Sequence, residues 1–280
     1  MKPVRLFVLS LALMGLLAAC GGEEADPQSA AEPAPEPATT EAIQETPFDT
    51  YFDLSGLDQE ALDRAMQTID QESTLEDITV HVRQTLGDSR SLYIIFDVIY
   101  PGEADPAEYF TARLASGAVS DPSQAEDLPG QASSSVNGAQ TQSDTMTYLA
   151  AFDFWEPTLT GQTVSLLIES PAGGRTYAFT WTPENEGFFA QASLTYQTGN
   201  PVGSAALSSF LLTLEIPGMD GDQWVSLANT LALLGADGTA LPASLGWDAD
   251  GSRFFAQVYT PAAAGSVQTI QAGDYTGAFQ

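Results

Sequence analysis

Apolar residues recur at every second position of short segments after residue 73, and this pattern restricts the chain to a fold built from β-sheets. Ile78, Val80 and Val82 alternate with polar neighbours, which places the two kinds of side chain on opposite faces of a strand. Similar segments follow as far as residues 275–279, separated by Gly, Pro, Asn and Asp residues that favour turns. Many short strands at this spacing predict antiparallel β-sandwiches.

The chain is long enough for two such sandwiches. One sandwich needs about 100 residues, and the predicted folded part, residues 48–280, is more than twice as long. The turn-forming sequence Thr198-Gly199-Asn200-Pro201 is a candidate boundary. We therefore predict a first module over residues 48–198, with a short helix and a sandwich, and a second sandwich over residues 199–280.

Three local predictions rest on residue pattern. Leu57–Ile69 has apolar residues at helical spacing, which predicts a helix capped by Ser55 or Asp58. Ser116–Ser143 is polar and rich in Gly, Ser and Gln, which predicts a long loop. Trp224–Leu234 is predicted to be a strand of the second module.

A short internal repeat favours two modules. Trp181 is followed, after six intervening residues, by Phe188-Phe189-Ala190-Gln191, and Trp247 is followed at the same spacing by Phe254-Phe255-Ala256-Gln257. In a hairpin the Trp ring would lie beside a Phe ring of the next strand, a contact worth roughly 0.2–1 kcal/mol. The match is short, and the two halves do not align elsewhere, so coincidence is the alternative.

The N-terminus has the three parts of a secretory signal in order. Two basic residues precede the apolar run Leu6–Leu17, which is too short to span a bilayer of about 30 Å. Small residues continue to Ala19, and Cys20 follows, as in a bacterial lipobox. We predict a signal peptide over residues 1–19, cleavage between Ala19 and Cys20, and lipid on Cys20; the alternative is an ordinary signal with an accidental cysteine.

Residues 20–47 follow the predicted anchor as an acidic, proline-rich segment. They contain five prolines and seven acidic residues but no aromatic residue. Such a composition cannot bury enough apolar surface to offset the entropy of ordering. We predict a disordered linker that holds the folded body away from the lipid headgroups.

The chain is strongly acidic, with 37 acidic and 8 basic residues and a net charge of −29. Such a protein repels nucleic acid and has few cations for counterion release, so no nucleic-acid partner is expected. It also repels anionic headgroups, which leaves the lipid on Cys20 as the membrane contact. Together with the signal peptide and the lipobox, this predicts an extracytoplasmic location, with the chain lipid-anchored to the outer face of the bacterial cell membrane.

Residue types exclude most catalytic devices. Cys20 is the single cysteine and His81 the single histidine, so their number excludes a zinc site of His and Cys, and we expect no disulfide within the chain. Lipid on Cys20 would leave no free thiol for Cys catalysis. His81 lies in a predicted strand and is interpreted as a solvated strand residue rather than a catalytic base. Paired carboxylates remain available for hydrolysis, but no pair stands out. We predict no enzyme activity, no catalytic residues and no cofactor.

Two features are candidates for ligand binding. Asp248 and Asp250 resemble oxygen-rich Ca²⁺ ligands, but glycine follows too early for an EF-hand loop, and Asp-Gly is a strong hairpin-turn signal. The second feature is the set of four tryptophans, which either form a sugar-stacking surface or pack in the core. Its members are Trp155, Trp181, Trp224 and Trp247.

Several strand segments resemble an uncharacterised extracytoplasmic domain family of Gram-positive bacteria, found in anti-sigma-factor-like membrane proteins and in envelope lipoproteins. They are Asp77–Asp88, Ser91–Val98, Gly161–Leu166 and Ser266–Asp274. The resemblance implies tandem immunoglobulin-like modules. It supplies no catalytic residues, because none are established for the family.

These observations predict a mainly β, lipid-anchored envelope protein with two immunoglobulin-like sandwiches. We expect it to act as a non-catalytic interaction or sensing module with an unidentified envelope protein as its partner. The alternative is a lipoprotein that binds carbohydrate or Ca²⁺.

Overall fold

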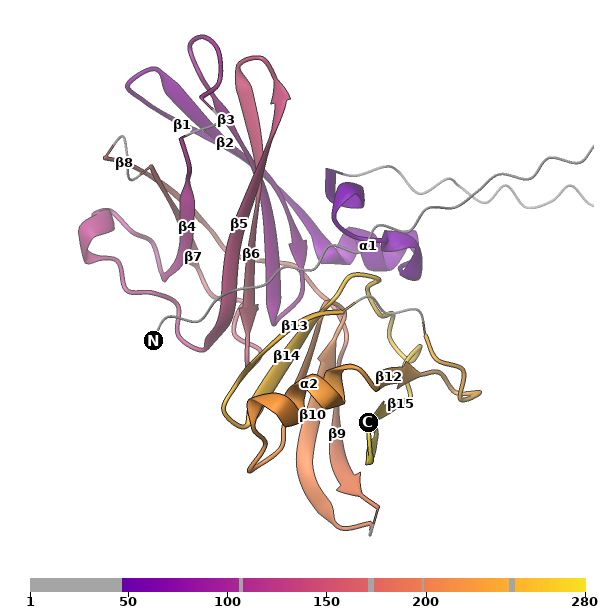
Figure 1. Cartoon of the computed structure of the whole chain (residues 1–280). Helices are drawn as coiled ribbons and strands as arrows, with labels where there is room; N and C mark the ends of the chain where they lie inside the picture. The colour runs from indigo at the N-terminus through magenta and orange to yellow at the C-terminus, as the bar shows by residue number, and fades with distance from the viewer. Residues whose placement is uncertain (1–46, 106–107, 171–173, 198, 242–244) are drawn as a thin grey trace, which may run out of the picture. The chain divides into compact units, whose positions relative to one another are not determined.

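The computed structural model describes residues 47–105, 108–170, 174–197, 199–241 and 245–280. As predicted, these residues form mainly antiparallel β-structure (Figure 1). The first part, up to Trp181, contains a short helix and eight strands. They are α1 Gln59–Ala65, β1 Met66–Leu75, β2 Ile78–Gly87, β3 Ser91–Ile99, β4 Thr111–Ser116, β5 Gln131–Gln142, β6 Thr145–Phe154, β7 Val164–Ser170 and β8 Arg175–Trp181, with 3₁₀ turns at Pro47–Thr50, Leu54–Gly56 and Pro122–Gln124.

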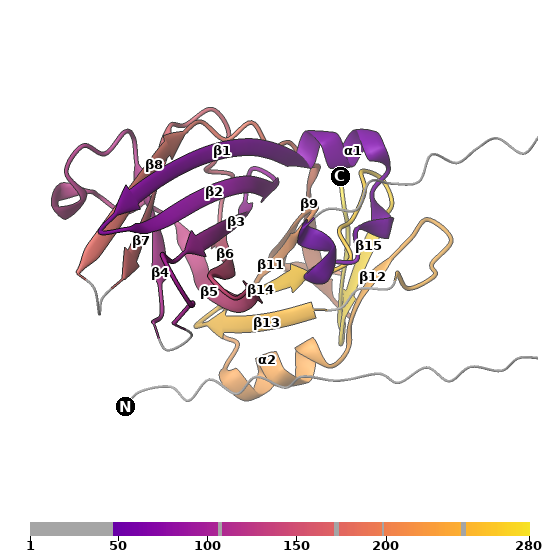
Figure 2. The ribbon, with the colours of Figure 1, turned by 90° about the horizontal axis from the view of Figure 1, so that it is seen from above.

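The first eight strands form two sheets that enclose one core. The five-stranded sheet has the order β1-β2-β3-β6-β5, and the three-stranded sheet the order β4-β7-β8; Figure 2 shows β1, β2 and β3 side by side. Val80 and Val82 of β2 share a core with Leu166 and Ile168 of β7. The period-two alternation therefore builds a β-sandwich here, because the apolar side of each strand faces the other sheet.

The segment before β1 covers the opposite face of the five-stranded sheet at one end. Leu62 and Ala65 of α1 are buried in a second cluster with Tyr93 of β3. Phe52 contacts the Tyr93 ring at 4.7 Å and the Phe210 ring at 5.8 Å between centroids. This cluster joins the N-terminal segment, the sandwich and the chain around Phe210.

The remaining strands form one eight-stranded antiparallel sheet, in the order β12-β15-β16-β9-β10-β11-β14-β13. Its apolar side chains form a separate core, to which Trp224 and Leu227 of helix α2 contribute. The elements are β9 Phe189–Tyr196, β10 Pro201–Ser208, β11 Leu211–Glu215, α2 Gly221–Ala228, β12 Leu231–Leu234, β13 Leu245–Asp250, β14 Arg253–Val258, β15 Thr269–Ala272 and β16 Tyr275–Ala278.

The structure corrects the predicted module boundary. β9 is hydrogen-bonded to β10 through seven register pairs and also pairs with β16. A boundary at residues 198–199 would divide two paired strands, whereas the change of sheet falls between β8 and β9. Residues 43–280 also cluster as one compact unit.

Three local predictions also need correction. The predicted helix 57–69 ends at Ala65, with Asp58 as its N-cap, because the chain from Met66 pairs with β2 instead. The predicted loop 116–143 contains the twelve-residue strand β5. The predicted strand 224–234 begins as helix α2, where Asp220 and Gln223 form a capping box, and only its end is the strand β12.

Candidate functional site

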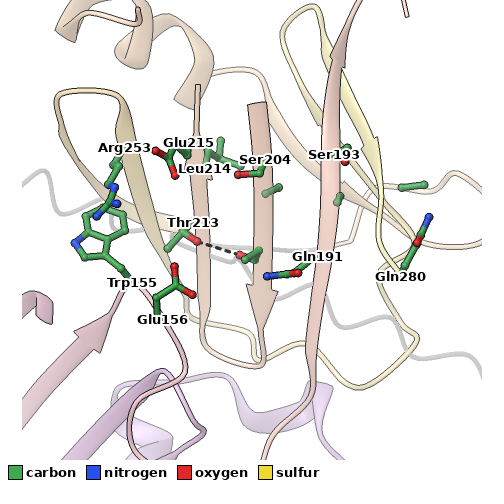
Figure 3. A pocket seen from close by; sticks show the side chains of 14 residues that line it. Trp155, Glu156, Gln191, Ser193, Ser204, Thr213, Leu214, Glu215, Arg253 and Gln280 are labelled. Atoms are coloured by element: carbon green, nitrogen blue, oxygen red, sulfur yellow. Dashed lines mark hydrogen bonds between the residues drawn. The ribbon is translucent and has the colours of Figure 1, made fainter. Parts of the chain in front are cut away.

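A pocket of about 590 Å³ lies over the polar face of β9, β10, β11 and β14 (Figure 3). The register creates this face, because Gln191 is paired with Ala206, and Ala206 with Thr213, so these residues share one side of the sheet. The residues that alternate with them along each strand, such as Ala192, Ala205 and Leu214, are buried in the core on the other side of the sheet. The polar lining side chains from these strands are Gln191, Ser193, Ser204, Thr213, Glu215 and Arg253.

One wall of the pocket comes from a different part of the chain. Trp155 and Glu156 follow β6 of the sandwich and line the pocket together with the sheet residues (Figure 3). The Trp155 ring contacts Phe255 edge-on, with 5.7 Å between centroids. The Arg253 guanidinium lies over the Trp155 ring, 5.2 Å from its centroid, a contact worth about 0.5–1 kcal/mol at an exposed site.

Arg253 differs in its partners from the other described arginines. Glu215 lies directly opposite it across β11 and β14, where an opposite-charge pair contributes roughly 0.2–1 kcal/mol. Yet among the described residues neither side chain has a hydrogen bond or an ion pair within 4.0 Å, and the Glu156 carboxylate has none either. The pocket therefore holds one cation and two carboxylates whose hydrogen-bonding capacity is open to a ligand.

A buried arginine supports the pocket from beneath. The Arg90 guanidinium is fully buried and donates to the carbonyls of Ala206, at 3.2 Å, and Trp155, at 2.9 Å, and to Thr213 Oγ1, at 2.7 Å. It thereby ties the Trp155 wall to the floor of the pocket. Burial lowers the pKa of Arg90, and the charges of Asp88, Glu156 and Asp153 act in the opposite direction.

Two buried carboxylates stand beside this arginine. Asp88 accepts hydrogen bonds from the backbone amides of Arg90 at 2.7 Å and Ser91 at 3.0 Å, in the turn between β2 and β3. The turn needs Gly87, because a Cβ there would lie 2.1 Å from the Ser91 carbonyl oxygen. Burial raises the pKa of Asp88.

Asp153 near the end of β6 is the second buried carboxylate. Four side chains donate to it: Ser91 at 2.9 Å, Tyr93 at 3.3 Å, Ser133 at 2.8 Å and Gln257 at 2.8 Å. The bond from Gln257 of β14 joins the second sheet to the sandwich. Burial raises the pKa of Asp153, although these hydrogen bonds oppose the shift.

The structure does not bring the four tryptophans together. Trp155 lines the pocket, whereas Trp181 is buried in the sandwich core. Trp224 of α2 and Trp247 of β13 stack on Phe254, with centroids 5.4 and 5.5 Å away. Since the Trp155 partner Phe255 and its neighbour Phe254 point to opposite faces of β14, Trp155 and Trp247 lie on opposite sides of the sheet.

The repeated Trp–Phe pattern therefore has two different structures. The predicted contact is confirmed for Trp247 and Phe254, which belong to the hairpin of β13 and β14. It is wrong for Trp181, because β8 pairs with β7, and the following strand β9 belongs to the other sheet.

The candidate Ca²⁺ ligands lie in the same hairpin. The Asp248 carboxylate accepts a hydrogen bond from the backbone amide of Ala249 at 2.8 Å. The backbone of Asp250 is the strand-register partner of Arg253 at the end of the hairpin, beside Gly251, which has a φ of 58°. The described residues contain no group of three or more His, Cys, Asp or Glu side chains suited to a metal ion. Here the Asp-Gly sequence makes the turn.

His81 lies on β2, and its Nε2 is 2.8 Å from an Asp70 carboxylate oxygen. It is not among the pocket residues, whose described members include serines and glutamates but no histidine. The described pocket residues offer hydroxyl, amide, guanidinium and carboxylate groups, which suit binding by hydrogen bonds and charge.

Ala19 and Cys20 lie outside the described residues, as do the rest of the predicted signal peptide and nearly all of the linker. Within the part that the structure describes, no helix is long and apolar enough to cross a membrane.

Apart from Trp155, sequence reasoning missed the residues that form the pocket and its support. Asp153 gave a usable signal, since it is a charged residue within the apolar segment Leu149–Trp155. Arg253 and Glu215 gave none, because their meeting depends on which strands are neighbours in the sheet.

Comparisons with known proteins add little. No protein-family model matches the chain, and no curated protein matches it. Among solved structures, the crystal structure of the conserved domain protein from Bacillus anthracis is similar, with a TM-score of 0.44 and 11% identity over 73% of this chain and 75% of that chain.

Proposed function

We propose that this protein is a lipid-anchored, non-catalytic binding or sensing module of the bacterial envelope, which takes a small polar ligand into the pocket over β9, β10, β11 and β14. The observation that carries the proposal is the set of open hydrogen-bonding groups around this pocket, provided by Arg253, Glu156 and Glu215. The proposed partner of the folded part, residues 48–280 with its ligand bound, is an envelope protein. The lipobox at Cys20 supports the location.

Carbohydrate is a second candidate ligand class. It is favoured by the single tryptophan at the pocket and by the amides of Gln191 and Gln280 beside it, since sugars present both apolar faces and hydroxyl groups. The described residues offer Ca²⁺ no comparable group of ligands.

We also propose that the chain contains tandem immunoglobulin-like modules and that it is related to the extracytoplasmic domain family it resembles. Residues 20–47 are proposed to be a disordered linker. The facing antiparallel sheets of the first part support the immunoglobulin-like proposal. The low apolar content of the linker supports the proposal for its disorder.

Lipidation is tested by Cys20→Ala. We expect the variant to leave the membrane fraction and to appear in the soluble extracytoplasmic fraction, because the thiol is the attachment point and two or more acyl chains are needed for firm anchoring. Fractionation followed by immunoblotting measures this. Cys20→Ala protein that stays in the membrane fraction would contradict the anchor.

Ligand binding at the pocket is tested by Ser204→Trp. Ser204 is exposed and has no side-chain hydrogen bond among the described residues, so the indole should fill the pocket with little effect on folding. A panel of amino acids, peptides and sugars should raise the melting temperature of the wild type but not of this variant. Ser135→Trp, at an exposed serine of β5, is the control and should keep the response. A flat response of the wild type to the whole panel would remove the proposal.

A further inference from the structure

The pocket contains opposite charges that do not form an ion pair with each other. Arg253 and Glu215 are direct neighbours across β11 and β14, the position at which an ion pair ordinarily forms. Arg253 instead stacks on Trp155, a residue contributed by the sandwich. The tryptophan therefore holds the guanidinium away from its cross-strand carboxylate, and both groups face the same pocket.

Stacking also gives Arg253 a defined orientation. A guanidinium that lies over an aromatic ring directs its five N–H donors sideways, where they match the two oxygens of a carboxylate. Trp155 is itself fixed, because its carbonyl accepts a hydrogen bond from the buried Arg90 at 2.9 Å. The cation is thus held in place before a ligand arrives, which reduces the entropy lost on binding.

The carboxylates suit the opposite charge. Glu215 and Glu156 line the pocket without an ion pair within 4.0 Å among the described residues, although the charge of Glu156 also acts on the buried Arg90, and the whole chain carries a net charge of −29. An ammonium group is attracted to such a site, whereas a simple anion is attracted by Arg253 but repelled by both glutamates.

We propose that the pocket binds a zwitterion, an amino acid or a short peptide with free ends, whose carboxylate lies on Arg253 and whose ammonium lies on Glu215. This inference rests on the proposed function of the pocket as a ligand site. The amide side chains of Gln191 and Gln280 at the other side of the pocket (Figure 3) match the donors and acceptors of a peptide backbone.

The test uses the mature chain carrying Cys20→Ala and isothermal titration with glycine, triglycine, N-acetyl-triglycine and triglycine amide. Either uncapped ligand is expected to bind, and each cap is expected to weaken triglycine binding by at least about tenfold, because it removes one charged hydrogen-bonded contact. Glycine and triglycine distinguish a free amino acid from a peptide as the ligand.

Two variants assign the ends of the ligand. Arg253→Gln should lose the sensitivity to the amide cap but keep that to the acetyl cap, and Glu215→Gln should do the reverse. Arg83→Gln, at an arginine of β2 paired with Asp97, is the control and should keep both.

Equal affinities for capped and uncapped peptides would overturn the proposal that the ligand is a zwitterion. The same proposal would fall if a neutral sugar such as cellobiose bound while glycine and triglycine did not. If Ser204→Trp blocked that sugar, the proposal that the pocket is a ligand site would still stand. Absence of binding for every ligand of both panels would overturn the two proposals together.

Discussion

Replacing Arg90 by Met is expected to lower the free energy of unfolding by about 3–5 kcal/mol. The guanidinium is fully buried and donates to the carbonyls of Ala206 and Trp155 and to the Thr213 hydroxyl. Methionine fills a similar volume but leaves these acceptors without a donor. It also leaves the buried carboxylates of Asp88 and Asp153 without the nearest positive charge.

Urea unfolding followed by circular dichroism measures this loss. Arg83→Met is the matched control, because Arg83 is partly exposed and its ion pair with Asp97 is 3.6 Å long, so we expect a loss of only about 0–1 kcal/mol. Equal effects of the two substitutions would mean that the buried arginine does not hold the sandwich and the second sheet together.

A double substitution tests the electrostatic part of this explanation. Arg90→Met combined with Asp153→Asn should destabilise by less than the sum of the two single changes, because the second change removes a carboxylate that the first leaves uncompensated. Strict additivity would assign the loss to the three hydrogen bonds of Arg90 alone.

The sheet-based fold was predictable because its cause is local. Alternation such as that of Ile78, Val80 and Val82 reports which side of a strand meets the core, and all three residues are buried in the sandwich. The hairpin of Trp247 and Phe254 was predictable for the same reason, since a turn of Asp and Gly residues brings the two strands together.

Predictions failed where distant contacts override local pattern. β5 reads as a loop because it is polar, without regular apolar alternation, yet it is hydrogen-bonded along its length to the apolar strand β6. Trp224 suits a strand by propensity, but the capping box at Asp220 and the contact of its ring with Phe254 favour a helix. The boundary was misplaced because turn residues at 198–201 connect strands within one sheet as readily as they separate modules.

The pocket was the least predictable feature. Its lining comes from residues 155–156, 191–193, 204–206, 213–215 and 253, with residues 278 and 280. The strands β9, β10 and β11 follow one another in the sequence, but nothing in the sequence indicates that β14 pairs with β11 or that Trp155 lies beside them. Of the four tryptophans named as candidate ligand contacts, Trp155 is the one that lines the pocket. The sheet order, which depends on long-range pairing, decides which of them reaches the pocket.

Acidification is expected to stabilise the wild type relative to Asp153→Asn. Burial raises the pKa of Asp153, so the folded chain keeps this proton to a higher pH than the unfolded chain does. The folded state therefore binds more protons between the two pKa values. The contribution of Asp153 to stability is then greatest below the ordinary carboxyl pKa and falls as the pH rises through the raised value, by at most about 1.4 kcal/mol per pH unit.

Urea unfolding of both proteins between about pH 7 and about pH 4 measures this difference, and the other acidic residues cancel because both chains carry them. Asparagine keeps one oxygen for Ser91 and Tyr93, and the Gln257 amide can turn to accept from its new N–H₂ group. Asp121→Asn provides a control of opposite sign, since hydrogen bonds from Ser123 lower the pKa of this exposed carboxyl, so its contribution is lost as the pH falls. If the free energies of unfolding of wild type and Asp153→Asn run parallel against pH, the Asp153 carboxyl ionises in the folded chain as it does in the unfolded chain. A stability of the wild type, relative to Asp153→Asn, that rises toward acid pH would identify Asp153 as a buried carboxyl whose ionisation the folded state opposes.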